Sequence, residues 1–408
     1  MGHFFDINKL FTPLFTLWVL SMFTSYSYAD EPDFLTPYVR AAYVYDSNLF
    51  RLADDQAAIA ALGKADTAVS YSTLAAGVDM DLRLSRQTIR AHAEINRTHF
   101  DDYSALDYAG RDASVTLEWL AGESLTGDLG IKETLTHASY TNVKQPVKNL
   151  VRTRRTFVDG VLGTDSAWQF KLGLERTTID NGAAAQQIQD ADINLVKAGV
   201  EYESKGGSKV EFVTQRTDAK YPNRQLISTV AVNNGYRQWD NGIVASWIAT
   251  GKTQLLGRLN HTRRSYQDVP QRDFTGLTGI LAANWAVTDI TALRLSLHRD
   301  IGATDSDTAS YAVKRGITLE ANWRPTQKLA FVAQLSRDKI DYSGEPQVAL
   351  NIAPAREDRL TTLHAGLTYS ILRNTTIGIS VQKGRRESNE ALSGYRYSQA
   401  LLTIRSQF

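Results

Sequence analysis

The stretch YSQALLTIRSQF, residues 397–408, alternates between apolar and polar side chains. Its apolar face is formed by Ala400, Leu402, Ile404 and Phe408, and its polar face by Gln399, Thr403, Arg405 and Gln407. A period of two is that of a β-strand with two chemically different sides. We therefore expect residues 397–408 to form a strand that ends at Phe408.

Alternation of the same kind recurs through most of the chain. It is found in VDMDLRLS (78–85), IRAHAEIN (89–96), ASVTLEW (113–119), WQFKLGLE (168–175), LRLSLHR (293–299) and IGISVQ (377–382). With their flanks, these segments approach the roughly nine to eleven residues that a tilted barrel strand needs to cross a bilayer. Because lipid offers no hydrogen-bond partners to the backbone, a span built from strands must close on itself. The apolar rows then face lipid and the polar rows line the lumen.

The connectors between these segments are of two kinds. Short ones lie at 85–86, 121–122, 163–166, 205–207, 250–252, 288–289, 324–327 and 373–374. Longer ones lie at 48–65, 140–149, 181–190, 218–234, 302–307 and 343–357. Short turns on one side and long loops on the other are typical of outer-membrane barrels. The sequence predicts an all-β, antiparallel up-and-down transmembrane barrel of about eighteen strands, from near Pro37 to Phe408, with sixteen strands as the alternative.

Aromatic residues support this interpretation. Trp119, Trp168, Trp247, Trp285 and Trp323 lie within a few residues of a predicted short turn, and Trp239 does not. Indole rings concentrate at the membrane interface of barrels. Four tyrosines near the predicted mouths, Tyr43, Tyr45, Tyr395 and Tyr397, are expected in the same girdle, with stacking on sugar rings as the alternative.

The N-terminus has the pattern of a targeting segment. Lys9 precedes the apolar run Leu10–Met22, and small residues at 27 and 29 suit a signal peptidase. We expect a cleaved signal peptide at residues 1–29, followed by one barrel domain at residues 30–408 in the outer membrane of a Gram-negative bacterium. An uncleaved anchor is the alternative.

Composition excludes several classes of function. The 408 residues carry a net charge of +1, which argues against a nucleic-acid partner, and the absence of cysteine excludes thiol catalysis and disulfides. The histidines lack the spacing of a zinc motif, and no nucleophile-elbow pattern is present. We therefore predict no enzyme, no catalytic residues, no metal site and no cofactor. A site assembled from distant strands is the alternative.

Several motifs together resemble a known family. They are YVYDSNLFRL (43–52), YESKGGSKVEF (202–212), NGYRQWD (234–240), WIATGKT (247–253), RDFTGLTG (272–279) and LSGYRYSQALLTIRSQF (392–408). The chain resembles the EpsL-type outer-membrane proteins encoded with exopolysaccharide systems at exosortase/PEP-CTERM (XrtB) loci, a porin-like group. The resemblance implies a role in the export or surface handling of an exopolysaccharide. It also implies the exopolysaccharide chain, outer-membrane lipid and periplasmic polysaccharide-export proteins as partners.

Two sets of residues are candidates for that role. The predicted lumen-lining residues are Arg83, Arg90, His92, Glu94, Lys171, Glu175, Arg258, Arg294, His298, Lys314 and Glu320. The predicted family motif comprises Tyr45, Asp46, Ser47, Asn48 and Arg51. The motif either caps the mouth or is a strand exit in which Asp46 and Asn48 bind the local backbone.

The charges expected in the lumen suggest the cargo. Cations at 83, 90, 132, 171, 197, 258, 294, 314 and 405 meet acids at 79, 81, 94, 118, 128, 175, 201, 211, 320 and 338. A conduit for a strongly anionic polymer should instead be dominated by one sign. We expect a passive polar conduit for a neutral or weakly charged glycan in exopolysaccharide export or anchoring. A general diffusion porin and a plugged scaffold that recruits secretion partners are the alternatives, and cross-strand pairing alone also explains the charges.

Overall fold

The computed structural model describes residues 34–141, 143–223, 235–267, 270–303, 311–343 and 355–408. The predicted signal peptide lies outside these residues, as do parts of the long loops predicted at 218–234, 302–307 and 343–357. Eighteen strands form the fold. They are β1 (Leu35–Asp46), β2 (Val69–Leu84), β3 (Gln87–Phe100), β4 (Tyr108–Ala121), β5 (Leu125–His137), β6 (Leu150–Leu162), β7 (Trp168–Asn181), β8 (Ala191–Glu203), β9 (Lys209–Lys220), β10 (Tyr236–Thr250), β11 (Thr253–Tyr266), β12 (Phe274–Thr288), β13 (Thr291–Ala303), β14 (Tyr311–Thr326), β15 (Leu329–Ser343), β16 (Glu357–Leu372), β17 (Thr375–Ser388) and β18 (Tyr395–Gln407).

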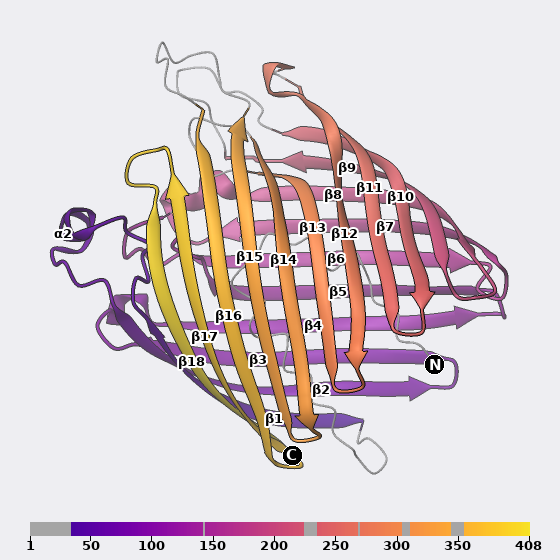
Figure 1. Cartoon of the computed structure of the whole chain (residues 1–408), viewed down its shortest axis with the longest axis horizontal. Helices are drawn as coiled ribbons and strands as arrows, with labels where there is room; N and C mark the ends of the chain where they lie inside the picture. The colour runs from indigo at the N-terminus through magenta and orange to yellow at the C-terminus, as the bar shows by residue number, and fades with distance from the viewer. Residues whose placement is uncertain (1–33, 142, 224–234, 268–269, 304–310, 344–354) are drawn as a thin grey trace.

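These strands form one closed antiparallel ring (Figure 1). Each strand pairs with the next along the chain, and β1 also pairs with β18. At this closure Tyr38 lies opposite Gln407, and Asp46 lies opposite Gln399. The prediction of an eighteen-stranded up-and-down barrel is confirmed, and the sixteen-stranded alternative is wrong.

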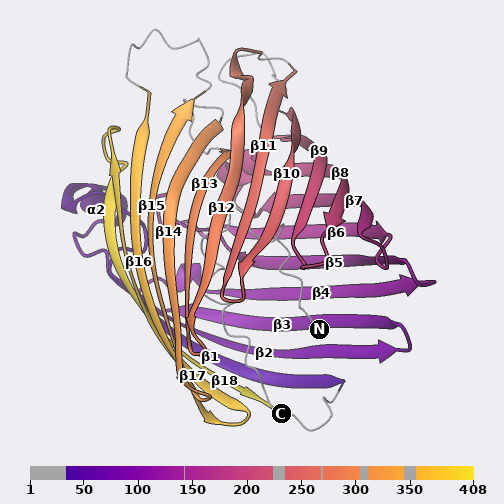
Figure 2. The same cartoon turned by 45° about the vertical axis from the view of Figure 1, so that its right-hand side comes forward.

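The strands of the two walls run in different directions. In Figure 1, β1–β9 run across the picture behind β10–β18, and Figure 2 shows the same two walls after a turn of 45°. Strands must tilt for a sheet to close into a barrel, so opposite walls cross when viewed from the side.

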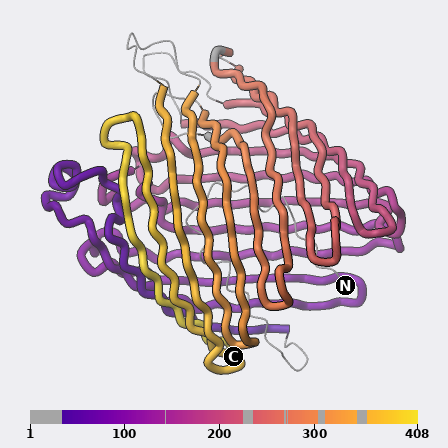
Figure 3. The backbone as a smooth tube through the Cα atoms, viewed as in Figure 1, coloured from indigo at the N-terminus to yellow at the C-terminus, as the bar shows by residue number. Residues whose placement is uncertain are grey.

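Short turns gather at one end of the ring and long connections at the other, as the backbone in Figure 3 shows. Two residues separate β10 from β11, β12 from β13, β14 from β15 and β16 from β17. The turn predicted at 324–327 lies instead at 327–328, because β14 continues to Thr326. We call the two ends the short-turn rim and the long-loop rim.

The long-loop rim carries the helices. Residues 47–68 contain α2 (Asp55–Leu62), whose N-cap Asp54 accepts a hydrogen bond from the backbone N–H of Ala57. Short 3-10 turns, η2 (Ser104–Leu106), η3 (Ala184–Gln189) and η4 (Pro270–Arg272), lie in other connections. Within the described ranges, no helix combines the length and apolar character needed to cross a bilayer.

Large apolar side chains cover the outer face of the ring. Leu295, Leu319, Leu335 and Leu363 lie opposite one another across β13–β16, and each is 43–51% exposed. Such a row would be costly in water but matches the lipid-facing band of a transmembrane barrel. The five tryptophans predicted near short turns lie on strands close to the short-turn rim. Trp239 on β10 lies toward the long-loop rim.

Candidate functional site: the lumen wall and its mouth

The predicted lumen-lining residues lie on the inner face of the ring. They alternate with the lipid-facing residues along the same strands, and successive side chains of a strand point to opposite sides. Arg294 and His298, for example, alternate with Leu293, Leu295 and Leu297 on β13. The register places on this face Arg83, Arg90, His92, Glu94, Lys171, Glu175, Arg258, Arg294, His298, Lys314 and Glu320.

Several inner side chains reach across an intervening strand. The Tyr38 hydroxyl on β1 donates to Glu94 Oε2 on β3 at 2.8 Å, and Arg40 Nη2 lies 2.6 Å from Glu94 Oε1. Lys171 Nζ on β7 lies 3.2 Å from Glu211 Oε2 on β9. Neighbouring strands are about 4.8 Å apart, so a contact across two spacings requires side chains that converge. Convergence identifies this face as the concave, interior one.

Glycines on the bridged strands make these contacts possible. Gly77 on β2 lies under Tyr38, and a Cβ at this glycine would be 2.5 Å from the phenol ring. Gly316 on β14 lies between His298 and Asp338, and a Cβ there would be 2.1 Å from Asp338 Oδ1. That oxygen is 3.0 Å from His298 Nε2. Any larger residue would obstruct the bridge. Gly173 and Gly199 underlie further bridges in the same way.

Most of the other predicted lumen residues have a partner of opposite charge. Their contacts are His92 Nδ1 to Asp79 Oδ1 at 2.6 Å, Arg155 Nη2 to Glu175 Oε2 at 2.7 Å, Lys171 Nζ to Glu201 Oε2 at 2.5 Å, and Lys314 Nζ to Asp338 Oδ2 at 3.2 Å. Arg90 pairs with Asp81 and Glu118, and Arg83 lies 3.6 Å from Asp81. The wall thus holds both signs close together.

Two predicted residues have looser surroundings. Arg294 lies directly opposite Glu320 in the register, although Glu320 accepts a hydrogen bond from Asn322 at 2.7 Å. Arg258 lies within electrostatic reach of Asp240 and Asp300. Even here a basic side chain is placed near acids, so the charge of the wall is balanced locally.

The predicted family motif lies where β1 ends at the long-loop rim. Asp46 is fully buried and binds Arg51 through two contacts, Nη1 to Oδ1 at 2.8 Å and Nη2 to Oδ2 at 2.9 Å. Asn48 Nδ2 donates to the carbonyl of Leu52 at 2.8 Å, and Asn48 Oδ1 accepts from its N–H at 2.9 Å. The N–H of Ser47 donates to the carbonyl of Ser398 on β18. Tyr45 is exposed on the outer face. The motif shapes the exit of β1 and ties it to β18.

Arg51 has unusual surroundings. Its backbone has a φ of 55°, in the left-handed region that residues with a Cβ seldom adopt. Burial by itself would lower the pKa of Arg51, but hydrogen bonds and charge from Asp46 raise it overall. The guanidinium lies 3.7 Å from the centre of the Tyr397 ring. The girdle position expected for Tyr395 and Tyr397 is wrong, because the register turns both side chains inward; Tyr395 is only 6% exposed.

Next to the motif is a small apolar core. Phe50 is fully buried and makes edge contacts with the rings of Tyr103 and Tyr140, at 5.2 and 4.7 Å between centroids. The cluster consists of Phe50, Leu52, Ala58, Val69, Phe100, Leu106 and Tyr140. It joins residues 47–68 to the connections after β3 and β5. The loops on this side of the mouth are therefore packed together as one unit.

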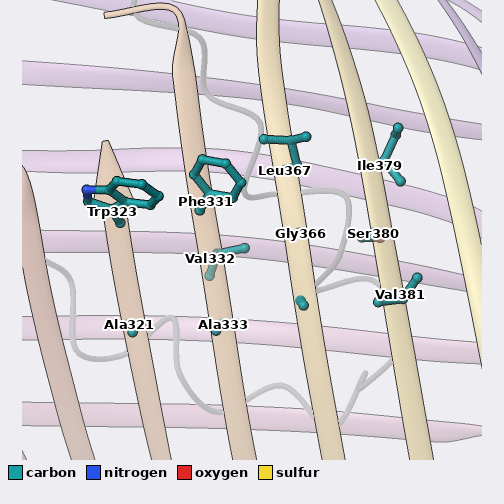
Figure 4. Close-up of a pocket in the computed structure, with 11 residues that line it drawn as sticks. Ala321, Trp323, Phe331, Val332, Ala333, Gly366, Leu367, Ile379, Ser380 and Val381 are labelled. Carbon is teal, nitrogen blue, oxygen red and sulfur yellow. The ribbon is translucent and has the colours of Figure 1, made fainter. Parts of the chain in front are cut away.

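The outer face has an apolar depression near the short-turn rim (Figure 4). Trp323 on β14 stacks on Phe331 on β15, with 5.0 Å between ring centroids. Leu367, Ile379 and Val381 on β16 and β17 line the rest. Its position on the outer face separates it from the lumen.

Sequence reasoning left one set of residues unassigned. Outward-facing arginines occupy the ends of many strands toward the long-loop rim, and they carry the same parity as the leucines. The sequence LRLSLHR contains that signal, because Arg299 falls on the face of Leu293, Leu295 and Leu297. Among the described residues, no group of three or more His, Asp or Glu side chains is arranged to hold a metal ion.

The strands form a closed ring of eighteen with an apolar outer face and a charged inner face. This architecture defines the class of the protein as an outer-membrane porin-like barrel. Residues 259–408, from within β11 to the end of β18, match the model of a family described as "Putative beta-barrel porin 2". No curated protein sequence matches the chain.

Solved structures with the same fold come from Pseudomonas aeruginosa. OccK2 (OpdF) is 11% identical, with a TM-score of 0.52 over 92% of this chain and 98% of that chain. OpdK, solved with vanillate, is 9% identical, with a TM-score of 0.51 over 92% and 99%. OccK2 has also been solved in complex with glucuronate, with 12% identity and a TM-score of 0.50 over 92% and 98%. At these identities the similarity is one of fold.

Proposed function

We propose that the protein is a passive conduit for a neutral or weakly charged exopolysaccharide in the outer membrane of a Gram-negative bacterium. One observation carries the proposal: the charges of the inner wall are paired with each other. Lys171, for instance, lies between Glu201 and Glu211, and Asp338 lies between His298 and Lys314.

Paired charges suit a polymer that must slide without being held. Barrels of sixteen to eighteen strands enclose a lumen too wide for their own side chains to fill, so water occupies the interior. Sugar hydroxyls exchange hydrogen bonds with such a wall at little cost, whereas a wall of one sign would retain a polyanion. The energy for movement would come from synthesis in the inner membrane. The motif resemblance to EpsL-type proteins supports the same cargo and points to periplasmic export proteins as partners.

A diffusion porin for small solutes is the second candidate. Its support is the fold shared with OccK2 and OpdK, whose structures hold glucuronate and vanillate. Both molecules are small carboxylic acids, so a porin of that kind should favour small anions. The balanced wall described above gives no such preference, which is why we rank polymer transport first.

Planar bilayers can test the proposal with defined probes. Single channels of the purified barrel would be recorded with dextran, a neutral glycan, with polygalacturonate, an anionic one, and with glucuronate. We expect steady conductance with frequent, brief blockades by dextran and fewer or longer blockades by polygalacturonate.

Other outcomes would replace this function. Channels that ignore dextran but are occupied by glucuronate would indicate the small-solute porin. Bilayers that stay silent, although the barrel is shown to be folded by its heat-modifiable mobility in SDS gels, would indicate a plugged scaffold. Deletion of the gene with unchanged polysaccharide secretion would also contradict the proposal.

A further inference from the structure

The outer face becomes basic toward the long-loop rim. Along β13, Leu295 and Leu297 are followed by Arg299, and along β14 the outward residue after Ile317 is Arg315. Both arginines are exposed. We call the cations at this level of β13–β18 the basic belt: Arg299, Arg315, Arg337, Lys339, Arg359, Lys383, Arg385 and Arg396.

The register sets cations of the belt directly opposite other cations. Arg299 faces Arg315, Arg315 faces Lys339, and Lys339 faces Arg359. Like charges directly opposite each other destabilise a sheet. Among the described outward residues of β13–β18, eight cations meet three acids, Asp341, Glu357 and Glu387. Four belt cations, Arg315, Lys339, Arg359 and Arg385, form ion pairs with these acids. Among the described residues, no acid lies within ion-pair distance of the other four, Arg299, Arg337, Lys383 and Arg396, so the belt has an excess of positive charge that anions from outside the protein can balance.

A depression in the belt has the polarity of an amphiphile. Leu297 and Ile317 form its apolar part, and Arg315, Arg337, Lys339 and Arg359 form its basic part, around a volume of about 440 Å³. His298, Gly316 and Asp338, whose side chains belong to the inner face, complete the lining. Acyl chains fit beside the two aliphatic residues, where the lipid-facing rows of the barrel continue. A phosphate at the head of those chains would lie at the level of the arginines, whose planar guanidinium groups bind phosphate through two hydrogen bonds.

The two ends of the lipid-facing band differ in chemistry. The short-turn rim has the aromatic girdle, with Trp323 and Phe331 as members. The long-loop rim has the basic belt. A bilayer with identical leaflets gives no reason for this difference, whereas a leaflet rich in phosphorylated lipid on the long-loop side does.

We propose that the basic belt binds the phosphate groups of a phosphorylated glycolipid in the leaflet at the long-loop rim. The proposal concerns the outside of the barrel and does not depend on what passes through the lumen. A soluble polyanion is the less suitable occupant, because the depression includes aliphatic residues continuous with the lipid-facing band.

Native mass spectrometry of the full barrel with lipid A can test the assignment. The variant is Arg315→Gln with Arg337→Gln and Arg359→Gln, which leaves Lys339 to pair with Asp341 and Glu357. We expect bisphosphorylated lipid A to remain bound to the wild type and to bind about fivefold more weakly for each arginine removed. Lipid A without phosphates should be lost from both proteins.

A matched control removes three cations from the opposite rim, Arg324→Gln, Lys328→Gln and Arg373→Gln, with the same change in net charge. Equal weakening in this control, or equal retention of dephosphorylated lipid A, would overturn the proposal. So would full displacement of the lipid by polygalacturonate, which has no acyl chain. If the triple variant does not fold, the single Arg337→Gln variant should bind lipid A about fivefold more weakly. Unchanged binding by this single variant would also overturn the proposal.

Discussion

A single buried carboxylate organises the mouth of the barrel. Asp46 is fully buried, and its two oxygens bind the guanidinium of Arg51, which in turn covers the ring of Tyr397. A bidentate ion pair between a guanidinium and a carboxylate is strong, and its two parallel hydrogen bonds also fix the relative orientation of the two side chains. It connects the end of β1 with β18 and fixes the left-handed backbone of Arg51.

Replacing Asp46 with Asn should loosen this region. The change leaves Arg51 buried without its counter-charge, a loss of roughly 3–5 kcal/mol for a buried pair. We expect trypsin to cleave within residues 47–68 while the strands stay protected, and limited proteolysis followed by mass spectrometry measures this. Arg51→Lys keeps the charge but not the fork, so it should lie between the wild type and Asp46→Asn. Equal resistance of all three proteins would contradict the role given to the pair.

At the residue scale the sequence could assign faces but not partners. Alternation alone placed His298 and Lys314 on the polar face. That both meet Asp338 depends on the register, and the contact of His298 also depends on the curvature of the wall, which brings side chains two strands apart together. The girdle prediction for Tyr395 and Tyr397 is wrong because it rests on their aromatic character, whereas the alternation followed back from Gln399 turns both side chains inward.

At the scale of the element, each strand is a boundary between lipid and water. Adjacent residues on β15 illustrate this, since Leu335 faces the lipid row and Gln334 faces His364 and Glu320 across the inner wall. An arginine should therefore have opposite effects at the two positions. Leu335→Arg should lose about 2–4 kcal/mol near the bilayer midplane, whereas Gln334→Arg should be tolerated. The yield of each variant folded into lipid vesicles can be measured from its heat-modifiable shift in SDS gels. Similar yields for Leu335→Arg and Gln334→Arg would contradict the assignment of the two faces.

The glycines of the bridged strands lead to a second prediction. Gly316→Ala would place its Cβ 2.1 Å from Asp338 Oδ1, and the carboxylate cannot yield without leaving His298 and Lys314. We expect a loss of about 1–3 kcal/mol, typical of overpacking. Gly160→Ala on β6 is the control, because nothing lies within 4 Å of its added Cβ. Urea unfolding followed by tryptophan fluorescence gives both values, and matching midpoints would show that Gly316 has no such role.

The elements themselves were largely predictable. Strand positions followed from the period of two, and most short turns followed from pairs such as Arg373-Asn374. The apolar core of the mouth was not predictable as a unit, because Phe50, Leu106 and Tyr140 come from three separate connections. Only the folded ring brings those connections together.

At the scale of the whole molecule, the balance of charge along the wall should govern ion selectivity. Lys171 lies between two glutamates, so Lys171→Gln leaves Glu211 without this partner and Glu201 with Lys209 alone. We expect near-equal permeability to potassium and chloride in the wild type and a shift toward potassium in this variant. Reversal potentials under a salt gradient measure both. Lys383→Gln, the same change on the outer face, should leave the reversal potential unaltered, and an equal shift there would place the conducting path elsewhere.

Closure of the ring has a consequence for how the protein is made. Asp46 and Gln399 meet at the seam between β1 and β18, yet 353 residues separate them along the chain. Until both strands have been synthesised, any partial sheet has two unpaired edge strands, which can pair with strands of other chains. Such long-range pairing is slow. The polypeptide must therefore be kept unfolded by chaperones while it crosses the periplasm. Its insertion can be completed only in one late step, when β1 pairs with β18.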